Sequence, residues 1–172
     1  HRVVIEDFLV GEEASYIVIA DGTNYIALAT SQDHKRRNDG DLGPNTGGMG
    51  AYSPAPVVTA AVDAQVRREI IEPTLAAMRA EGHPFVGFLY AGLMIHQGRA
   101  SVLEYNVRCG DPETQPIMLR LKSDVIELYQ AAIDGRLGQV TCAWDPRSAV
   151  GVVLAAEGYP GPVRKGDPIG GL

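Results

Sequence analysis

"FVGFLYAGLMIHQGRASVLEYNV", at residues 85–107, contains two apolar runs joined by Gln97 and Gly98. The runs, 85–96 and 99–107, are rich in β-branched and aromatic residues, which is typical of β-strands. A glycine in so short a connection favours a tight turn. The stretch therefore predicts an antiparallel hairpin.

Further strands are predicted on both sides of this hairpin. Segments 2–9, 13–20 and 25–30 carry strand-forming residues, and an Asp-Gly pair at residues 21–22 predicts a turn between the last two. Segment 148–161 is predicted to begin a new apolar strand.

Two helices are predicted from capping residues and apolar spacing. Thr59 suits the N-cap of a helix to about residue 80, which Pro73 should kink or break and Gly82 should end. Ser123 suits the N-cap of a second helix through residue 133. The order of elements predicts an α+β (α/β) domain with a mostly antiparallel sheet backed by helices.

Composition limits the classes of partner. The net charge of -6 argues against a broad nucleic-acid surface, and no apolar run approaches the roughly 18 residues of a membrane span. Two cysteines, Cys109 and Cys142, make neither a disulfide framework nor a zinc site, so a reducing cytoplasm is the expected location. The chain starts in a strand-like run without Met, so we expect it to be part of a longer protein. We also expect a subdomain boundary near Trp144.

The second strand of the hairpin carries a candidate metal pair. Residues two apart on a strand face the same side, so Glu104 and Asn106 should project together. A carboxylate and an amide oxygen suit Mg2+ that is also held by substrate phosphates. A solvated polar sheet face is the alternative interpretation.

The segment "RCGDPETQ", residues 108–115, follows this pair directly. By alternation Arg108 should continue the same face, where a guanidinium suits a phosphate or carboxylate. Gly110 and the Asp111-Pro112 pair predict a sharp turn, and Glu113 adds a carboxylate. An ordinary turn with surface charges is the alternative.

Residues 31–56 lack periodicity and are dense in Gly, Pro, Asn, Asp and basic residues. Loops of this length are usually functional or disordered, so a mobile surface loop remains an alternative. Gly47, Gly48 and Gly50 leave backbone N–H groups accessible to an anion. A lone histidine such as His34 is more often structural or exposed than catalytic, and cations such as those beside it more often form a solvated patch.

The segment "IEDFLVGEE", residues 5–13, could form a sheet edge that offers backbone groups to a purine. A carboxylate there could accept from an adenine amino group or from ribose hydroxyls. A plain edge strand with outward charges is the alternative.

Five segments closely resemble the glycinamide ribonucleotide synthetase (phosphoribosylamine–glycine ligase) family of the ATP-grasp superfamily. They are "VIEDFLVGEEAS", "SQDHKR", "GPNTGGMGAYSPAP", "GFLYAGLM" and "EYNVRCGDPETQPIMLRLKSD". The resemblance covers nearly all of the chain. It implies that residues 1–143 form the second half of an ATP-grasp domain and that residues 144–172 begin a C-terminal domain. It also implies that an N-terminal domain and the first half of the ATP-grasp are missing.

The resemblance implies ATP-dependent ligation of glycine to 5-phosphoribosylamine through a glycyl phosphate, with Mg2+ or Mn2+, in purine synthesis. The implied metal ligands are Glu104 and Asn106, and Arg108 stabilises the phosphoryl group or the acyl phosphate. The implied ATP contacts are Glu6, Phe8, Leu9 and Glu12, with Glu13 as the alternative ribose ligand. The implied substrate contacts are Asp33, Asn45, Thr46, Gly47, Gly48, Asp111 and Glu113.

Two positions depart from the family pattern. Many ATP-grasp enzymes carry a further acidic metal ligand on the preceding strand, where this chain has Gly92, and Cys109 replaces a large apolar residue.

The implied partners are the two substrates and the missing N-terminal part, with no nucleic acid and no membrane. Because phosphate-clasping parts are absent, the isolated 172 residues are expected to be inactive. Another ATP-grasp carboxylate–amine ligase and a non-catalytic nucleotide-binding fragment remain alternatives.

Overall fold

The computed structural model describes residues 3–171 of the chain. Its centre is an antiparallel four-stranded sheet in the order β2-β1-β7-β8. These strands are β1 (Glu12–Asp21), β2 (Tyr25–Ala27), β7 (Val86–His96) and β8 (Arg99–Asn106). The predicted hairpin at 85–107 and the predicted pairing of 13–20 with 25–30 are confirmed.

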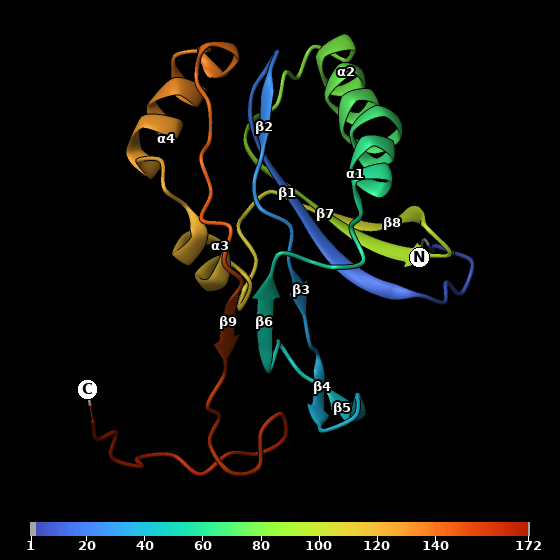
Figure 1. Cartoon of the computed structure of the whole chain (residues 1–172). Helices are drawn as coiled ribbons and strands as arrows, with labels where there is room; N and C mark the ends of the chain where they lie inside the picture. The colour runs from blue at the N-terminus through green and yellow to red at the C-terminus, as the bar shows by residue number, and fades with distance from the viewer. Residues whose placement is uncertain (1–2, 172) are drawn as a thin grey trace.

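Helices cover both faces of this sheet (Figure 1). One face packs on a continuous helical rod of α1 (Ala60–Val66), a π-helical turn η1 (Arg67–Ile71) and α2 (Glu72–Ala80). The other face packs on α4 (Val125–Ile133) and a short 3-10 turn η2 (Leu137–Gln139). The expected α+β fold, with a mostly antiparallel sheet backed by helices, is confirmed.

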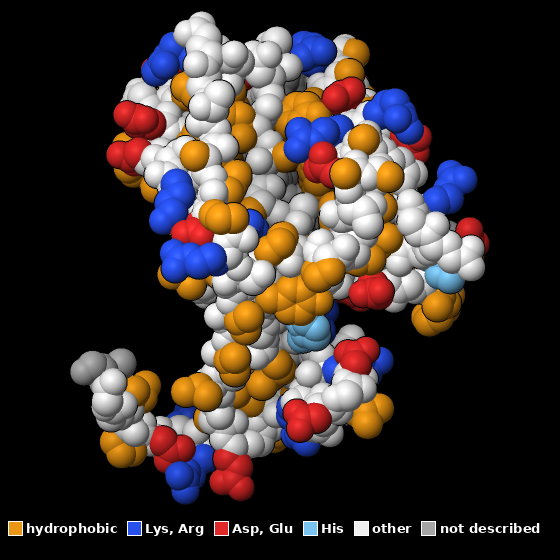
Figure 2. Space-filling view, viewed as in Figure 1, with side chains coloured by type: hydrophobic (Ala, Val, Ile, Leu, Met, Phe, Trp, Pro, Cys, Tyr) orange, Lys and Arg blue, Asp and Glu red, His pale blue; other side chains and the backbone are white. Residues whose placement is uncertain are grey.

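Smaller strands extend from the central sheet. A three-stranded antiparallel sheet has the order β3-β6-β9, and β4 pairs with β5. The strands are β3 (Gln32–Asp33), β4 (Arg36–Asn38), β5 (Leu42–Asn45), β6 (Gly50–Ser53) and β9 (Ala149–Val152). Figure 2 shows hydrophobic side chains at the surface in this lower part of the molecule, and Val150, Val152 and Leu154 are exposed. Four of these strands, β3 to β6, lie in segment 31–56, so this segment is not one long loop.

Thr59 caps the long helix as predicted, because its side chain accepts a hydrogen bond from the backbone N–H of Val62. Pro73 does not break the helix. It follows the π-helical turn η1 and lies in the first turn of α2, where the missing N–H of a proline is tolerated. Gly82, with φ +82°, follows the helix end as predicted.

The strand predicted to begin in segment 148–161 is present and short, as β9. Two other local predictions were wrong. Residues 3–10 form no strand, because no described strand pairs with them; Arg2, also in that prediction, lies outside the described residues. Asp124, not Ser123, caps α4, since its side chain accepts from Ile126 N–H at 2.8 Å while Ser123 accepts from Ala143 N–H.

A short helix, α3 (Thr114–Arg120), was not expected and is anchored by its last residue. The Arg120 side chain, in a residue only 8% exposed, donates to the backbone carbonyls of Asp145 and Arg147 and to Ser53 Oγ. These bonds attach α3 to the segment before β9 and to β6. No helix in the described part of the chain is long and apolar enough to cross a membrane.

Replacing Arg120 with Met should lower the free energy of unfolding by about 2–4 kcal/mol, because buried carbonyls and a serine lose charged hydrogen bonds. Chemical denaturation measures the change. Arg68→Met is the control, since Arg68 makes only an exposed ion pair with Glu69, and such pairs contribute little. Equal stability of the two variants would show that Arg120 is not an anchor.

The Asp145 carboxylate should make stability sensitive to acid. Hydrogen bonds from Arg147 and Lys122 hold the pKa of Asp145 far below its ordinary value of 3.8. A depressed pKa in the folded state means that the contribution is complete above pH 3.8 and is lost as pH falls below it. Denaturation at falling pH should show a shallower acid loss for Asp145→Asn than for wild type, whereas the exposed-loop control Asp39→Asn should retain the wild-type slope. A wild-type slope in Asp145→Asn would contradict this assignment.

Candidate active site

One face of the central sheet brings together the candidate metal ligands. The register aligns Ser15, Gly92 and Glu104 in one row, and Tyr90 with Asn106 in the next. Glu104 and Asn106 therefore share the face opposite the α1–α2 rod, as their spacing predicted. Asn106 Nδ2 donates to Glu104 Oε1 at 3.0 Å.

The arrangement fits a hard divalent cation. From the same face Glu104 can offer a carboxylate oxygen and Asn106 an amide oxygen, and Glu104 is exposed. Gly92 leaves room for the acid, because a Cβ there would lie 3.3 Å from Glu104 Cγ. No group of three or more His, Cys, Asp or Glu residues suited to a metal occurs among residues 3–171. The pair would therefore need further ligands from a bound phosphate or another part of the protein.

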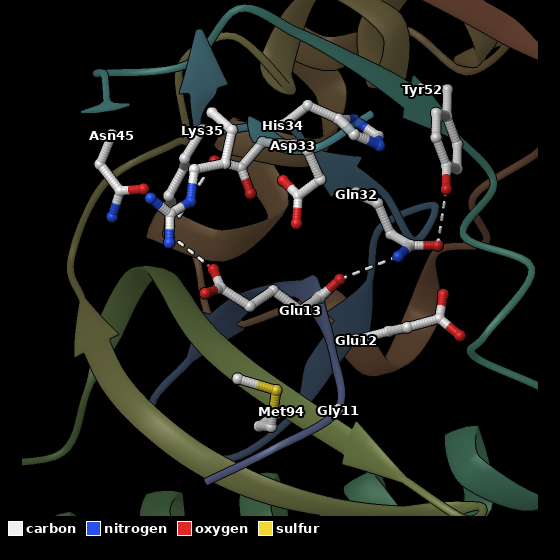
Figure 3. A pocket seen from close by; sticks show the side chains of 12 residues that line it. Gly11, Glu12, Glu13, Gln32, Asp33, His34, Lys35, Asn45, Tyr52 and Met94 are labelled. Carbon is white, nitrogen blue, oxygen red and sulfur yellow. Dashed lines mark hydrogen bonds and ion pairs between the residues drawn. The ribbon is translucent and has the colours of Figure 1, made fainter. Parts of the chain in front are cut away.

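Two neighbouring cavities adjoin this face. The larger, of about 390 Å³, is lined by residues of β1 and of β3 to β7, and includes Asp33 and Asn45 (Figure 3). The smaller, of about 240 Å³, shares Glu13, Asp33 and Lys35 with the first and also includes Glu104. The two cavities connect the surroundings of the acid–amide pair to segment 31–56.

Hydrogen bonds hold the wall shared by the cavities. Lys35 Nζ lies 2.9 Å from Glu13 Oε2. Gln32 Nε2 donates to the Glu13 carbonyl, and Tyr52 donates to Gln32 Oε1 (Figure 3). The sequence alone does not distinguish Lys35 from a solvated cation, because its partner Glu13 lies 22 residues away.

The charged residues of the "RCGDPETQ" segment differ in exposure. β8 ends at Asn106, so the predicted alternation does not extend to Arg108, which is exposed and donates to the Cys109 carbonyl. Asp111 is also exposed. Glu113 is only 2% exposed and accepts from Ser15 Oγ at 2.9 Å.

The predicted glycine loop is internally bonded. Gly48 N–H donates to Thr46 Oγ1, and Gly47 N–H donates to the Tyr159 hydroxyl. Gly48 is also packed against Pro112, leaving no room for a Cβ. The N–H groups of Gly47 and Gly48 are therefore already hydrogen-bonded, contrary to the expectation of accessible donors. Among the predicted contacts at residues 45–48, only Asn45 lines the larger cavity.

Only one of the predicted nucleotide contacts lines a cavity. Glu6 and Phe8 are exposed and Leu9 is half-buried in the irregular segment before β1, and none lines the two cavities. Glu12 lines the larger cavity. Glu13 is held by Lys35, which leaves Glu12 the less engaged of the two carboxylates.

Cys109 is half-buried next to Thr114. Burial raises the pKa of its thiol, while the hydrogen bond with Thr114 and the charge of Arg108 oppose that shift. A raised pKa disfavours the nucleophilic thiolate. The environment favours Cys109 as a packing residue.

The comparisons with known proteins agree with this architecture. A family model described as "Phosphoribosylglycinamide synthetase, ATP-grasp (A) domain" matches residues 1–114. The fold and the match define an ATP-grasp protein. The chain belongs to the phosphoribosylglycinamide synthetase family.

Individual relatives carry related names. The chain is 64% identical to a phosphoribosylamine–glycine ligase of Vibrio cholerae and 65% identical to one of Neisseria meningitidis serogroup A, over 99% of its own length. It spans 40% and 41% of those proteins.

Solved structures show the same fold. A phosphoribosylamine–glycine ligase of Thermotoga maritima matches with a TM-score of 0.82 and 39% identity, over 92% of this chain and 40% of that one. An L-amino acid ligase of Bacillus licheniformis, at 17% identity over 88% of this chain and 36% of that one, has a TM-score of 0.57, which is a likeness of fold alone.

Proposed function

We propose that this chain is the metal-bearing and acceptor-substrate half of an ATP-dependent ligase that joins glycine to 5-phosphoribosylamine. The observation that carries the proposal is the acid–amide pair Glu104–Asn106 beside cavities lined by Asp33 and Lys35. The names of relatives above 60% identity supply the substrates. The remaining portion of such a ligase would complete the ATP site.

In this proposal Glu104 and Asn106 hold Mg2+ or Mn2+, which when bound would neutralise charge on the ATP phosphates. Arg108 is exposed and engages only a backbone carbonyl among the described residues, so it is available to an anionic phosphoryl group or acyl phosphate. These residues would act by positioning and by electrostatic stabilisation.

The proposed ATP contacts are Glu6, Phe8, Leu9 and Glu12. Glu12 is preferred over Glu13 for the ribose hydroxyls, because Glu13 already binds Lys35. Residues 3–10 have no regular structure, and backbone groups in such a segment are available to a purine.

The proposed contacts for glycine and phosphoribosylamine are Asp33, Asn45, Thr46, Gly47, Gly48, Asp111 and Glu113. Asp33 and Asn45 line the larger cavity and are direct candidates. Thr46 and the two glycines would act by shaping the loop, since their polar groups bond within the chain. We also propose that residues 1–143 belong to the ATP-grasp domain and that residues 144–172 begin a C-terminal domain. The proposed location of the protein is the cytoplasm.

Assay of the full-length protein tests the function. ADP release should require both glycine and phosphoribosylamine in addition to ATP and Mg2+. Release that requires another carboxylate or amine would favour a different ATP-grasp ligase. ATP binding without any release, at every magnesium concentration, would favour a non-catalytic nucleotide-binding protein.

A further inference from the structure

The glycine-rich segment 43–50 is in contact with parts of the chain that are distant in sequence. Gly48 packs against Pro112 in the turn before α3. Gly47 N–H donates to the Tyr159 hydroxyl at 2.9 Å, across 112 positions of the sequence. The segment is therefore held from outside as well as by its own hydrogen bonds.

Tyr159 is itself restrained by its own turn and by β4. Its N–H donates to the Ala156 carbonyl at 3.2 Å, and its carbonyl accepts from Arg37 Nη1 at 3.4 Å. Figure 1 shows the segment after β9 turning back toward β4 and β5. The residue is half-buried, so a restrained side chain presents the hydroxyl to Gly47.

The loop that Tyr159 holds leads directly to a cavity wall. Asn45 lines the larger cavity and stands two positions before Gly47 (Figure 3). Thr46, between them, donates to the Lys35 carbonyl from its N–H at 2.7 Å and from its hydroxyl at 2.8 Å. Lys35 lines both cavities. A shift of Gly47 would therefore move Asn45 and Lys35 through directly bonded groups.

The contact is close on both sides. A Cβ on Gly47 would lie 3.2 Å from the Tyr159 oxygen, and beyond the chain neighbours of Gly47 no other atom of the described residues lies within 4 Å of that position. The fit thus depends on a glycine at position 47 and on a hydroxyl at position 159. Substitutions at two positions in direct contact are expected to have coupled effects.

We propose that Tyr159 is a positioning residue for the acceptor-substrate side of the site. Its hydroxyl fixes the loop that places Asn45 and Lys35 at the cavities. Tyr159 lines neither of these two cavities, so it acts through the loop and not on a ligand. The inference rests on the proposed function for the identity of the acceptor substrates, glycine and phosphoribosylamine.

Kinetics of the full-length protein test this role. Tyr159→Phe removes only the hydroxyl and should raise the KM of glycine or of phosphoribosylamine by about 3- to 10-fold, the effect of losing one hydrogen bond. The KM of ATP should stay within about twofold. Denaturation should show that the variant is fully folded at the assay temperature, so that the change in KM is not a loss of folded protein.

Tyr25→Phe is the matched control. Tyr25 is also half-buried, and its hydroxyl also makes one hydrogen bond, to Glu72 at 3.0 Å, on the side of the α1–α2 rod. The control loses an equivalent bond away from both cavities. It should therefore keep the KM values of all three substrates.

A second substitution makes the test specific to the contact. Gly47→Ala should raise the same KM, because the new methyl group would lie 3.2 Å from the Tyr159 oxygen. In Tyr159→Phe that oxygen is absent, so adding Gly47→Ala should raise the KM by a smaller factor than it does in wild type. Gly170→Ala is the control, since no atom lies within 4 Å of the added Cβ.

Calorimetry distinguishes this inference from the proposed function. The ligands are glycine and ribose 5-phosphate, in which a hydroxyl replaces the amine of phosphoribosylamine. Weaker binding of either ligand to Tyr159→Phe, in a protein that releases no ADP, would support the role of Tyr159 and reject the reaction.

Three results would overturn the role of Tyr159. The first is unchanged KM values and unchanged affinities in Tyr159→Phe. The second is an equal effect of Gly47→Ala in the presence and absence of the hydroxyl. The third is a lower KM in Tyr159→Phe, because the tyrosine would then compete with a ligand for the Gly47 N–H.

Discussion

Replacing Glu104 with Gln should lower kcat by about 100-fold or more, because the proposed metal ligand loses its charge where several kcal/mol of electrostatic stabilisation are needed. The same change should alter the free energy of unfolding by only about 0.5 kcal/mol, since Glu104 is exposed and a Gln oxygen can still accept from Asn106. Kinetics at several Mg2+ concentrations and denaturation measure the two quantities separately.

A charge-matched control makes the Glu104 result specific. Glu127 is exposed on α4, on an element that does not line the two cavities, so Glu127→Gln should retain wild-type kcat and magnesium dependence. An unchanged rate for Glu104→Gln at limiting Mg2+ would count against Glu104 as a ligand.

Replacing Arg108 with Met should lower kcat by about 100- to 1,000-fold, because a guanidinium directed at developing phosphoryl charge contributes at that scale. Stability should change by about 0.5 kcal/mol at most, because Arg108 is exposed and bonds only a neighbouring carbonyl. Steady-state kinetics and thermal unfolding check the two parts.

Arg99→Met provides the control for Arg108. Arg99 is exposed at the start of β8, the strand that ends just before Arg108, and among the described residues its side chain makes no hydrogen bond. The control should therefore keep both kcat and stability. If Arg108→Met loses activity only in proportion to lost stability, Arg108 has no role in phosphoryl transfer.

The hairpin at 85–107 shows how far local pattern predicts this fold. Two apolar runs joined by Gln97 and Gly98 predict the pairing of β7 with β8, and the two-residue spacing correctly places Glu104 and Asn106 on one face. The same local reasoning failed for residues 3–10. Strand-forming residues make a strand only where a neighbouring strand offers hydrogen bonds.

Neither the shared cavity wall nor the buried contact between Ser15 and Glu113 could be predicted from spacing. Ser15 and Glu113 are 98 positions apart, yet one hydroxyl proton joins them. Lys35 meets Glu13 only because β1 and the segment after β3 converge. Such pairings depend on the tertiary fold, and no periodicity within a single element encodes them. The arginine after β8 was misplaced for a related reason, since alternation ends where the strand ends.

Following the oxygen atoms of glycine tests the central claim most directly. If ATP phosphorylates the glycine carboxylate, a carboxylate oxygen enters the bond to phosphorus, and it leaves with the phosphate when the amine of phosphoribosylamine attacks the acyl carbon. Full-length protein supplied with glycine labelled by heavy oxygen in its carboxylate should release phosphate that carries one labelled oxygen per ligation. Phosphate free of label, released together with the ligated product, would contradict the account.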